Sequence, residues 1–315
     1  MERNHFLQSQ EWADFQKSLN LNRAFFNFNM DGLKSIYQKN NFPFGFNYFY
    51  FPRGLIFKKE INKLELDNFI NLFKQGTRPL NKSISLKIEP NENYSKELED
   101  ILKSSGFKKA KSIQPEETII IDLEKSEDEL LREMEHDTRY AIRYANRQGV
   151  QVIRLETIED KKKYFEDFWN IFKETNSKHT LRIYKKSYYE NFSNLNGKLK
   201  SYIYLAQING QNIASAIFLS YGSETFYMFA GSRTGFAKFN APSLIIWTAI
   251  RDFKLNGFKS LDLWGISDTN AKWLGVTRFK RGFRGKSIKY MGTWEYPLNK
   301  FYFYLFNLIK FILRR

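Results

Sequence analysis

The chain has 315 residues and a formal net charge of +16, from 50 Lys and Arg against 34 Asp and Glu. Its aromatic content of 17% supplies enough apolar surface for packed domains and excludes wholesale disorder. The lack of cysteine and the wide spacing of His5, His136 and His179 exclude disulfides, thiolate nucleophiles and Cys-ligated metal, and they predict no metal site. The positive charge suits nucleic acid, an anionic lipid surface or a phosphorylated substrate as a partner.

The N-terminal sequence MERNHFLQSQEW has no apolar core of the kind that a secretory signal requires. No window of the chain reaches the run of about 18 consecutive apolar residues that a membrane-spanning helix needs. These two features predict a cytoplasmic protein.

The first part of the chain follows the order hairpin, helix, strand. Apolar runs at 25–30 and 35–37 flank the turn dipeptide Asp31-Gly32, which is the pattern of a β-hairpin. Helix-like spacing at 64–73 then leads into the alternating sequence SISLKIEP, which predicts a strand.

The same order returns later in the chain. The strand sequences YIYLAQI and IASAIFLSY flank Asn209-Gly210, the strand ETFYMFAGS follows, and a helix at 241–255 leads to the strand SLDLWGIS. This repeat predicts an α/β (α+β) protein with two copies of one unit, each a mixed sheet flanked by helices. A single mixed sheet is the alternative. We expect one unit at 1–122, completed by 293–315, and the other at 123–292.

The segment between the two copies predicts helices. Ser126 and Glu129 have the spacing of a capping box, apolar residues continue at helical intervals, and Gly149 stands where a C-cap belongs. We therefore expect one helix across 126–149 and a second helix at 160–175.

Three arginines of the first of these helices, Arg139, Arg143 and Arg147, stand at i, i+4 and i+8. Residues four apart share one helix face, so these side chains form a basic stripe. The stripe either contacts the backbone of an RNA or is an ordinary solvated face.

The C-terminal sequence NKFYFYLFNLIKFILRR is apolar on most sides and carries Lys310, Arg314 and Arg315. One interpretation is a helix in the membrane interface, with its basic residues on anionic headgroups at the inner face of the plasma membrane. The other interpretation is a closing helix that packs on the body of the protein.

Residues 275–297 read GVTRFKRGFRGKSIKYMGTWEYP and combine cations, aromatic side chains and glycines. The mixture suits a loop and strand that approach an anionic partner closely, because the cations attract the partner and the glycines admit it. A basic strand edge that resists aggregation is the alternative.

Several kinds of catalytic site are excluded. The chain contains no G-x-S-x-G elbow, no plausible Ser/His/Asp order, no P-loop and no dinucleotide-binding glycine fingerprint. The chemistry that remains is that of Arg, Lys and Tyr side chains.

Several stretches in collinear order, over nearly the whole chain, resemble the FemABX family of peptidoglycan bridge-forming aminoacyltransferases. They are FLQSQEWADFQKSLN, FPRGL, DTRYAIRYANRQGV, FAGSRTGFAKFNAPSLIIWTAI, LDLWGIS and GVTRFKRGFRG. The resemblance implies two tandem acetyltransferase-like (GNAT) domains. It also implies transfer of an aminoacyl group from aminoacyl-tRNA to the stem-peptide amine of a peptidoglycan precursor, UDP-MurNAc-pentapeptide or lipid II, without cofactor or metal.

The resemblance also implies roles for individual residues. Lys280, beside Phe279, is the candidate catalytic cation, which would face the oxyanion that forms when the acceptor amine attacks the ester. Candidates for tRNA contact are Arg278, Arg281 and Arg284, in addition to the arginine stripe. Candidates for binding the acceptor are Arg182, Tyr184, Tyr188, Tyr227, Arg53 and Lys17. Some relatives have a substrate-contacting lysine at the position that aligns with Gln16, and Lys17 is the next residue. Alternatively, each of these tyrosines is simply a half-buried strand residue.

Three features depart from the family pattern, the first of which is Gln16 at the position of that substrate-contacting lysine. No sustained heptad run exists, so the coiled-coil arm of the staphylococcal-type members is not expected. The acyl-CoA fingerprint Q/R-x-x-G-x-G/A is absent from both copies, which favours tRNA over coenzyme A as the donor. The competing interpretations are a coenzyme-A-dependent N-acyltransferase of the same fold and a non-catalytic protein that binds RNA or a membrane surface.

Overall fold

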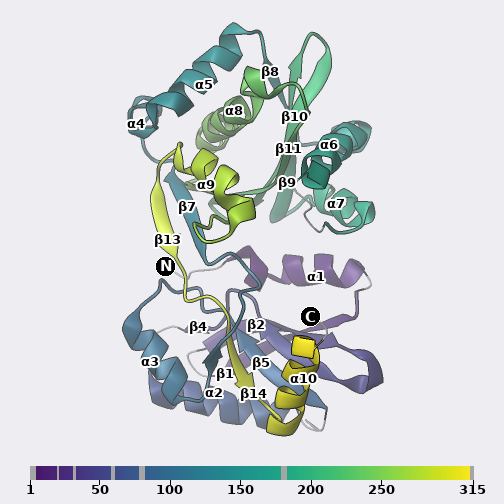
Figure 1. Cartoon of the computed structure of the whole chain (residues 1–315), viewed down its shortest axis with the longest axis vertical. Coiled ribbons are helices and arrows are strands. Elements are labelled where there is room, and N and C mark those ends of the chain that lie inside the picture. Colours follow the sequence, from purple (N-terminus) through teal and green to yellow (C-terminus); the bar gives the residue numbers. More distant parts are fainter. Residues whose placement is uncertain are drawn as a thin grey trace. The chain divides into compact units, whose positions relative to one another are not determined.

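The computed structural model describes residues 5–19, 21–30, 33–57, 61–77, 82–178 and 183–312. The chain divides into two compact units, one formed by Met1–Glu116 with Lys289–Arg315 and the other by Glu117–Ile288. Each unit contains one mixed β-sheet with helices packed on it (Figure 1). Within the described ranges, no helix has both the length and the apolar character that crossing a membrane requires.

The sheet of the first unit consists of β1 (Arg23–Met30), β2 (Leu33–Asn41), β3 (Asn47–Phe51), β4 (Ile56–Phe57), β5 (Ser83–Ile88), β6 (Lys108–Lys109) and β14 (Trp294–Pro297). Their order is β1-β2-β3-β5-β14-β6, with β4 paired to β2. β1 and β2 pair antiparallel, which confirms the two predicted hairpin strands, although Asp31 and Gly32 lie outside the described residues. Because β14 lies between β5 and β6, the C-terminal segment of the chain belongs to this unit.

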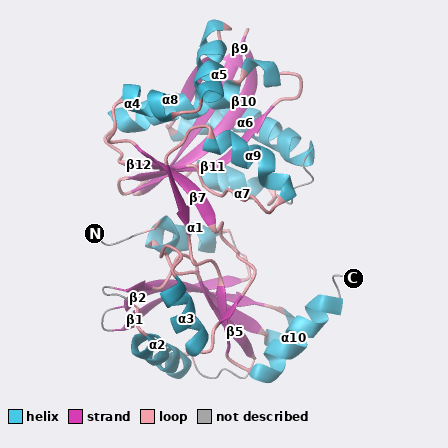
Figure 2. Ribbon diagram, turned by 60° about the vertical axis from the view of Figure 1, so that its left-hand side comes forward, coloured by secondary structure: helices cyan, strands magenta, loops and turns pink. Residues whose placement is uncertain are grey.

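The helices of the first unit are α1 (Gln10–Ser18), α2 (Lys63–Gly76), α3 (Lys96–Ser104) and α10 (Lys300–Ile312) (Figure 2). The predicted helix at 64–73 is confirmed as α2, and the Asn62 side chain caps it by accepting a hydrogen bond from the Glu65 N–H. Phe69 and Phe73 of α2 pack on buried aromatic residues of the sheet such as Phe51. The core of this unit is therefore largely aromatic.

The sheet of the second unit consists of β7 (Glu117–Asp122), β8 (Gln151–Leu155), β9 (Leu199–Ile208), β10 (Gln211–Tyr221), β11 (Glu224–Ser232), β12 (Ser260–Asp262) and β13 (Lys286–Lys289). Their order is β13-β7-β12-β11-β10-β9-β8. Asn209 and Gly210 have φ of 48° and 76°, the backbone that a tight β9–β10 hairpin requires. β7 pairs with β12, so the division of the chain falls after residue 116 and not after 122.

The helices of the second unit are α4 (Glu127–Glu133), α5 (His136–Arg147), α6 (Ile158–Lys178), α7 (Lys186–Ser193), α8 (Ala241–Leu255) and α9 (Leu274–Arg281). α8, with α5 beside it, covers one face of the sheet, and α6 and α7 cover the other (Figure 1). Successive strand residues alternate between these faces, so Tyr202, Tyr204 and Ala206 of β9 join the core cluster that contains α8.

The predicted single helix across 126–149 is wrong, because the structure has α4 and α5 there. The capping box of Ser126 and Glu129 is present at the start of α4. Met134 and Glu135 then adopt extended backbone, and buried Met134 joins the core. The apolar spacing continues across the break, so periodicity alone could not show it.

Candidate active site

The segment that carries Lys280 is the helix α9, so the predicted loop and strand is wrong for 275–281, and so is the alternative of a strand edge there. The strand β13 begins only at Lys286. Thr277 and Lys280, the buried residues of α9, are three positions apart, which is the spacing of a helix face and not of a strand. Cations in the last turn also suit the negative end of the helix dipole.

Contacts within the second unit fix α9 near both ends. Thr277 Oγ1 accepts a hydrogen bond from the Ser267 N–H at 3.0 Å and donates one to the Ser267 carbonyl oxygen at 3.1 Å. At the other end, the Glu135 N–H donates to the Gly282 carbonyl oxygen at 2.9 Å. A Cβ on Gly282 would lie 2.1 Å from Thr138 Oγ1, so the absence of a side chain allows α9 to approach α5 this closely. These contacts hold the backbone of Lys280 in a defined position.

The Lys280 side chain points into the protein and is only 7% exposed. Its Nζ donates a hydrogen bond to the Gly265 carbonyl oxygen at 2.9 Å and lies 5.7 Å from the centre of the Tyr227 ring. Burial lowers the pKa of the Lys280 ammonium to about 8, while the Asp262 carboxylate acts in the opposite direction and favours the charged form. The site therefore holds a desolvated cation at a pH near neutrality.

The early end of β12 creates this environment. The predicted strand SLDLWGIS is a strand only at Ser260–Asp262, whereas the neighbouring β11 continues to Ser232. Trp264 then has φ of 61°, and its N–H donates to Asp262 Oδ1 at 2.6 Å; the Thr118 hydroxyl donates to the same oxygen. The resulting turn presents the Gly265 carbonyl oxygen to Lys280. Asp262 and Gly265 were not among the predicted site residues.

Tyr227 and Phe279, two other predicted site residues, also lie in the second unit. Tyr227 is buried against Phe218, with ring centres 5.1 Å apart, and burial raises the pKa of its hydroxyl. Phe279 is half-buried and packs edge to face on Phe283 at 5.5 Å. The structure thus places Tyr227 beside Lys280, whereas Phe279 packs on Phe283.

The three arginines predicted beside Lys280 lie on the surface. Arg281 forms a bidentate pair with Asp268, at 2.7 and 2.6 Å, and Arg284 pairs with Glu135 at 3.2 Å. Arg278 is exposed on the same helix. Two of the three guanidinium groups therefore already have an acidic partner within the protein.

The arginine stripe divides into two kinds of residue. Arg139 is half-buried, and its guanidinium donates to the carbonyl oxygens of Leu131, Arg132 and Met134 at the end of α4. Arg143 and Arg147 are exposed. Arg139 therefore satisfies carbonyls that the end of a helix leaves unpaired, and only Arg143 and Arg147 remain as an exposed pair.

Replacing Arg139 should lower stability, whereas replacing Arg143 should not. Arg139→Ala removes donors from three carbonyl oxygens, and we expect a loss of about 1–3 kcal/mol in the free energy of unfolding. Arg143→Ala, at an exposed position of the same helix, should stay within about 0.5 kcal/mol of the parent. Urea unfolding of both variants measures the difference, and equal stabilities would refute the capping role.

Two of the three predicted acceptor-binding tyrosines, Tyr184 and Tyr188, lie in an aromatic cluster of the second unit. Tyr184 is 52% exposed and stacks on Tyr188 with ring centres 4.3 Å apart. Tyr188 also contacts Tyr189 and Phe229. Tyr188 belongs to α7 and Tyr184 to the segment before it, so neither is a strand residue, whereas Tyr227 is a buried residue of the strand β11. Arg182 lies outside the described residues.

Lys17 and Arg53 belong to the first unit. Lys17 is exposed and pairs with Asp14 at 3.5 Å. Arg53 is buried, donates to the Pro115 carbonyl oxygen at 2.7 Å and lies 3.6 Å above the Tyr290 ring. Their predicted contacts with substrate stay predictions. In the described part of the chain, no group of three or more His, Asp or Glu side chains is arranged to hold a metal ion.

Comparison with known proteins identifies the family. The model of the FemAB family matches residues 1–212 and 209–311, which is nearly the whole chain. The chain belongs to the FemAB family. Aminoacyltransferase FemB of Staphylococcus epidermidis is 30% identical to it over 110 residues, or 33% of this chain. The match spans only 26% of that FemAB relative's length.

Solved structures show the fold of this FemAB protein. The crystal structure of FemX superposes with a TM-score of 0.79 at 19% identity, covering 96% of this chain and 94% of FemX. The C-terminal domain of a putative lysylphosphatidylglycerol synthetase from Agrobacterium fabrum gives a TM-score of 0.59 at 12% identity, covering 93% of this chain and 89% of that chain. A tandem GNAT protein from the clavulanic acid biosynthesis pathway gives a TM-score of 0.50 at 10% identity, covering 91% of this chain and 88% of that chain. These similarities confirm the predicted tandem GNAT-like fold.

Proposed function

We propose that this FemAB protein is an aminoacyltransferase of peptidoglycan bridge formation. The donor is an aminoacyl-tRNA, and the acceptor is the stem-peptide side-chain amine of UDP-MurNAc-pentapeptide or lipid II. The reaction takes place in the cytoplasm, where charged tRNA is made. Membership of the FemAB family and the buried position of Lys280 support the proposal.

The reaction is aminolysis of an ester, and its atoms balance without a cofactor. The neutral acceptor amine attacks the ester carbonyl, a C–N bond forms, and the carbonyl oxygen becomes an oxyanion. The C–O bond to the tRNA ribose then breaks, and the proton lost by the amine neutralises the ribose oxygen. A preorganised cation beside the oxyanion lowers the barrier because it stabilises charge that exists only in the transition state.

Lys280 suits this role because of what its ammonium contacts. An ammonium has three N–H donors. Among the described residues, only the Gly265 carbonyl oxygen accepts a hydrogen bond from it, and no carboxylate forms an ion pair with it. Two donors therefore remain for a developing oxyanion. The surrounding apolar residues strengthen this interaction because they exclude water.

The remaining predicted residues fit roles in binding. The exposed Tyr184 ring, held by stacking on Tyr188, offers a surface for the peptide or sugar of the acceptor. The exposed side chains of Arg278, Arg143 and Arg147 offer cations for the phosphates of the tRNA acceptor arm. These assignments are part of the proposal and follow the family resemblance.

A donor comparison tests the proposed function. Purified protein is incubated with a panel of tRNAs, each charged with a radiolabelled amino acid, and with either acceptor form. We expect labelled acceptor from at least one charged tRNA and no acyl transfer from acetyl-coenzyme A. Transfer from acetyl-coenzyme A alone would identify a coenzyme-A-dependent N-acyltransferase, and no transfer from any donor would indicate a binding protein.

A further inference from the structure

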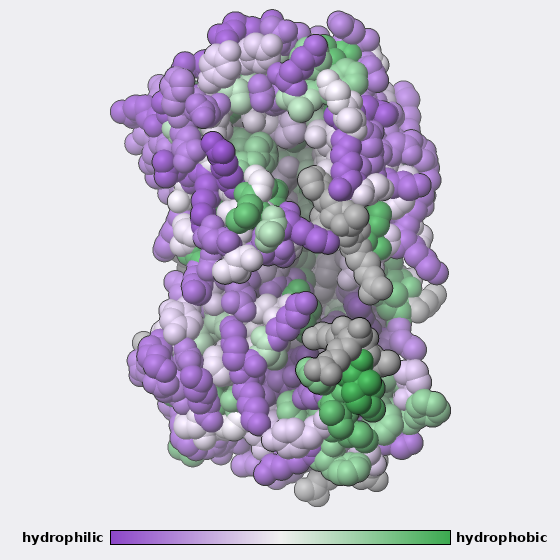
Figure 3. Space-filling view, viewed as in Figure 1, coloured by the Kyte–Doolittle hydropathy of each residue, from purple (hydrophilic) through white to green (hydrophobic). Residues whose placement is uncertain are grey.

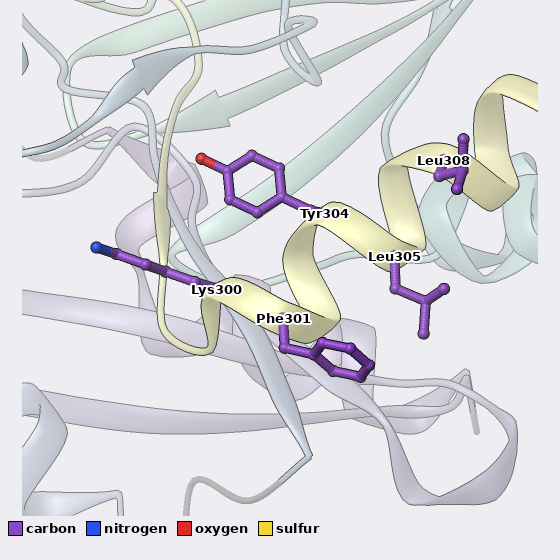
Figure 4. A pocket seen from close by; sticks show the side chains of 5 residues that line it. All are labelled: Lys300, Phe301, Tyr304, Leu305 and Leu308. Atoms are coloured by element: carbon purple, nitrogen blue, oxygen red, sulfur yellow. The ribbon is translucent and has the colours of Figure 1, made fainter.

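The helix α10 turns its apolar stripe outward. Large apolar side chains of α10 are 41–71% exposed, namely Phe301, Tyr304, Leu305, Leu308, Ile309, Phe311 and Ile312. They stand at i, i+3, i+4, i+7, i+8, i+10 and i+11, the stripe that an amphipathic helix normally buries. Figure 3 shows this surface as a hydrophobic patch, and Figure 4 shows Phe301 and Leu305 projecting from the same side of the helix. Patches of this kind on a soluble domain mark interaction surfaces.

The opposite side of α10 packs on the first unit. Phe303 is buried, Phe306 packs on Phe42 at 5.0 Å, and Tyr302 packs on Phe46 at 5.0 Å. The predicted closing helix is therefore confirmed for one face of α10, which packs on the body of the protein, and the other face is exposed. These contacts hold α10 in place without its exposed apolar stripe, so the stripe is not part of the hydrophobic core of the first unit.

The loop that holds α10 adds to the same surface. Phe44, between Phe42 and Phe46, is 85% exposed. Its carbonyl oxygen accepts a hydrogen bond from Lys82 Nζ at 2.8 Å, and this ammonium lies 5.9 Å from the centre of the Phe46 ring. An aromatic side chain displayed at the tip of an ordered loop, with a cation beside it, extends the apolar surface beyond the helix.

The charges around the patch indicate which kind of partner it fits. The sequence of α10 contains no Asp or Glu and begins with the exposed Lys300. Exposed Lys108 donates to Tyr304 Oη at 3.0 Å on the helix surface, and Lys82 lies beside Phe44. Apolar side chains rimmed by lysines complement an acyl layer covered by anionic headgroups. A second copy of this chain would bring the same lysines against one another, in a protein whose net charge is +16.

From this geometry we propose that α10 and the Phe44 loop dock the protein on an anionic lipid surface. The 13 residues of α10 form a helix of about 20 Å, which suits a position in the plane of the interface. Phe301, Leu305 and Leu308 enter the boundary between headgroups and acyl chains, and Lys82, Lys108 and Lys300 bind the headgroups. The inference does not depend on the transfer reaction.

Vesicle binding by matched double variants tests the docking surface. Phe301→Asp/Leu308→Asp places two carboxylates in the exposed stripe. Leu64→Asp/Leu255→Asp also replaces two exposed apolar side chains by carboxylates, at leucines outside α10 that are 70% and 87% exposed, so the net charge of both variants falls by two. We expect the parent and the control to co-sediment with vesicles that contain phosphatidylglycerol, and the α10 variant to bind at least about ten-fold more weakly. Circular dichroism and urea unfolding should show all three proteins equally folded.

Two results would overturn the proposal. Equal binding of the α10 variant and its control would place lipid contact elsewhere, on general surface charge. Absence of vesicle binding by the parent, together with a dimer in sedimentation analysis that only the α10 variant disrupts, would assign the patch to a second copy of the chain.

Discussion

Replacing Lys280 should abolish most of the transfer activity while the protein stays folded. In Lys280→Ala and Lys280→Met we expect the transfer rate at saturating substrates to fall by about 10²–10³-fold, the range seen when one preorganised oxyanion donor is removed. The affinity for the acceptor should change by less than about three-fold, because the interaction exists mainly in the transition state. Single-turnover transfer assays and acceptor titrations measure the two quantities.

Stability measurements separate this catalytic role from a structural one. Lys280→Met keeps most of the side-chain volume and removes a buried charge, but it also removes the donor of the Gly265 carbonyl oxygen, so its free energy of unfolding should fall by no more than about 1–3 kcal/mol. Lys286→Ala, a loss of an exposed lysine in the following strand, is the matched control and should keep nearly full activity. A Lys280 variant that is fully active, or one that is inactive only because it unfolds, would refute the catalytic assignment.

Gly282→Ala should be strongly destabilising because of one atom in α5. The added Cβ would lie 2.1 Å from Thr138 Oγ1 and 3.3 Å from the Phe279 carbonyl oxygen, so α9 must move. Overpacking of this kind costs about 1–3 kcal/mol. Gly282 has helical backbone, with φ of −58°, so the close approach and not a special conformation is the cause. Urea unfolding measures the loss, and slower transfer should accompany it because Lys280 lies on the displaced helix.

A second substitution tests that explanation. Thr138→Ala removes the clashing oxygen, and the double variant should recover much of the stability lost by Gly282→Ala, as a positive coupling energy in a double-mutant cycle. Thr138→Val keeps an atom at the same position and should give no recovery. Equal recovery from both partner substitutions, or a Gly282→Ala variant as stable as the parent, would show that the contact does not limit the packing of α9.

Local signals predicted the elements of the fold well. Asn209-Gly210 predicts a hairpin because both residues adopt positive φ readily, and they do so here. Ser126 and Glu129 predict a helix start because their side chains satisfy each other's backbone N–H groups. In contrast, the break at Met134 arises from tertiary packing, since the buried methionine and the capping Arg139 both act across the gap between α4 and α5. The spacing of apolar residues along the sequence does not show such tertiary contacts.

The candidate site was predicted only in part, for a similar reason. Lys280 was named from a family resemblance, but its burial follows from the early end of β12 and the turn at Trp264, which sequence spacing does not show. The sequence does contain one signal of this turn. Asp262 stands inside the apolar run SLDLW, and an acidic residue in such a run has to be satisfied by specific partners, here the Thr118 hydroxyl and the Trp264 N–H.

The pH dependence of kcat/KM tests the central claim, that the ammonium form of Lys280 takes part in the reaction. The acceptor amine must be neutral to attack, so the rate rises with pH towards the ordinary amine pKa of about 10.4. Lys280 must be charged, and its pKa of about 8 means that its loss of a proton above this pH cancels further gain. We predict a rise up to about pH 8 and a plateau above it in the parent, but a continuing rise in Lys280→Arg, whose guanidinium stays charged. The same profile in both proteins, or a parent profile that keeps rising beyond pH 8, would contradict the account.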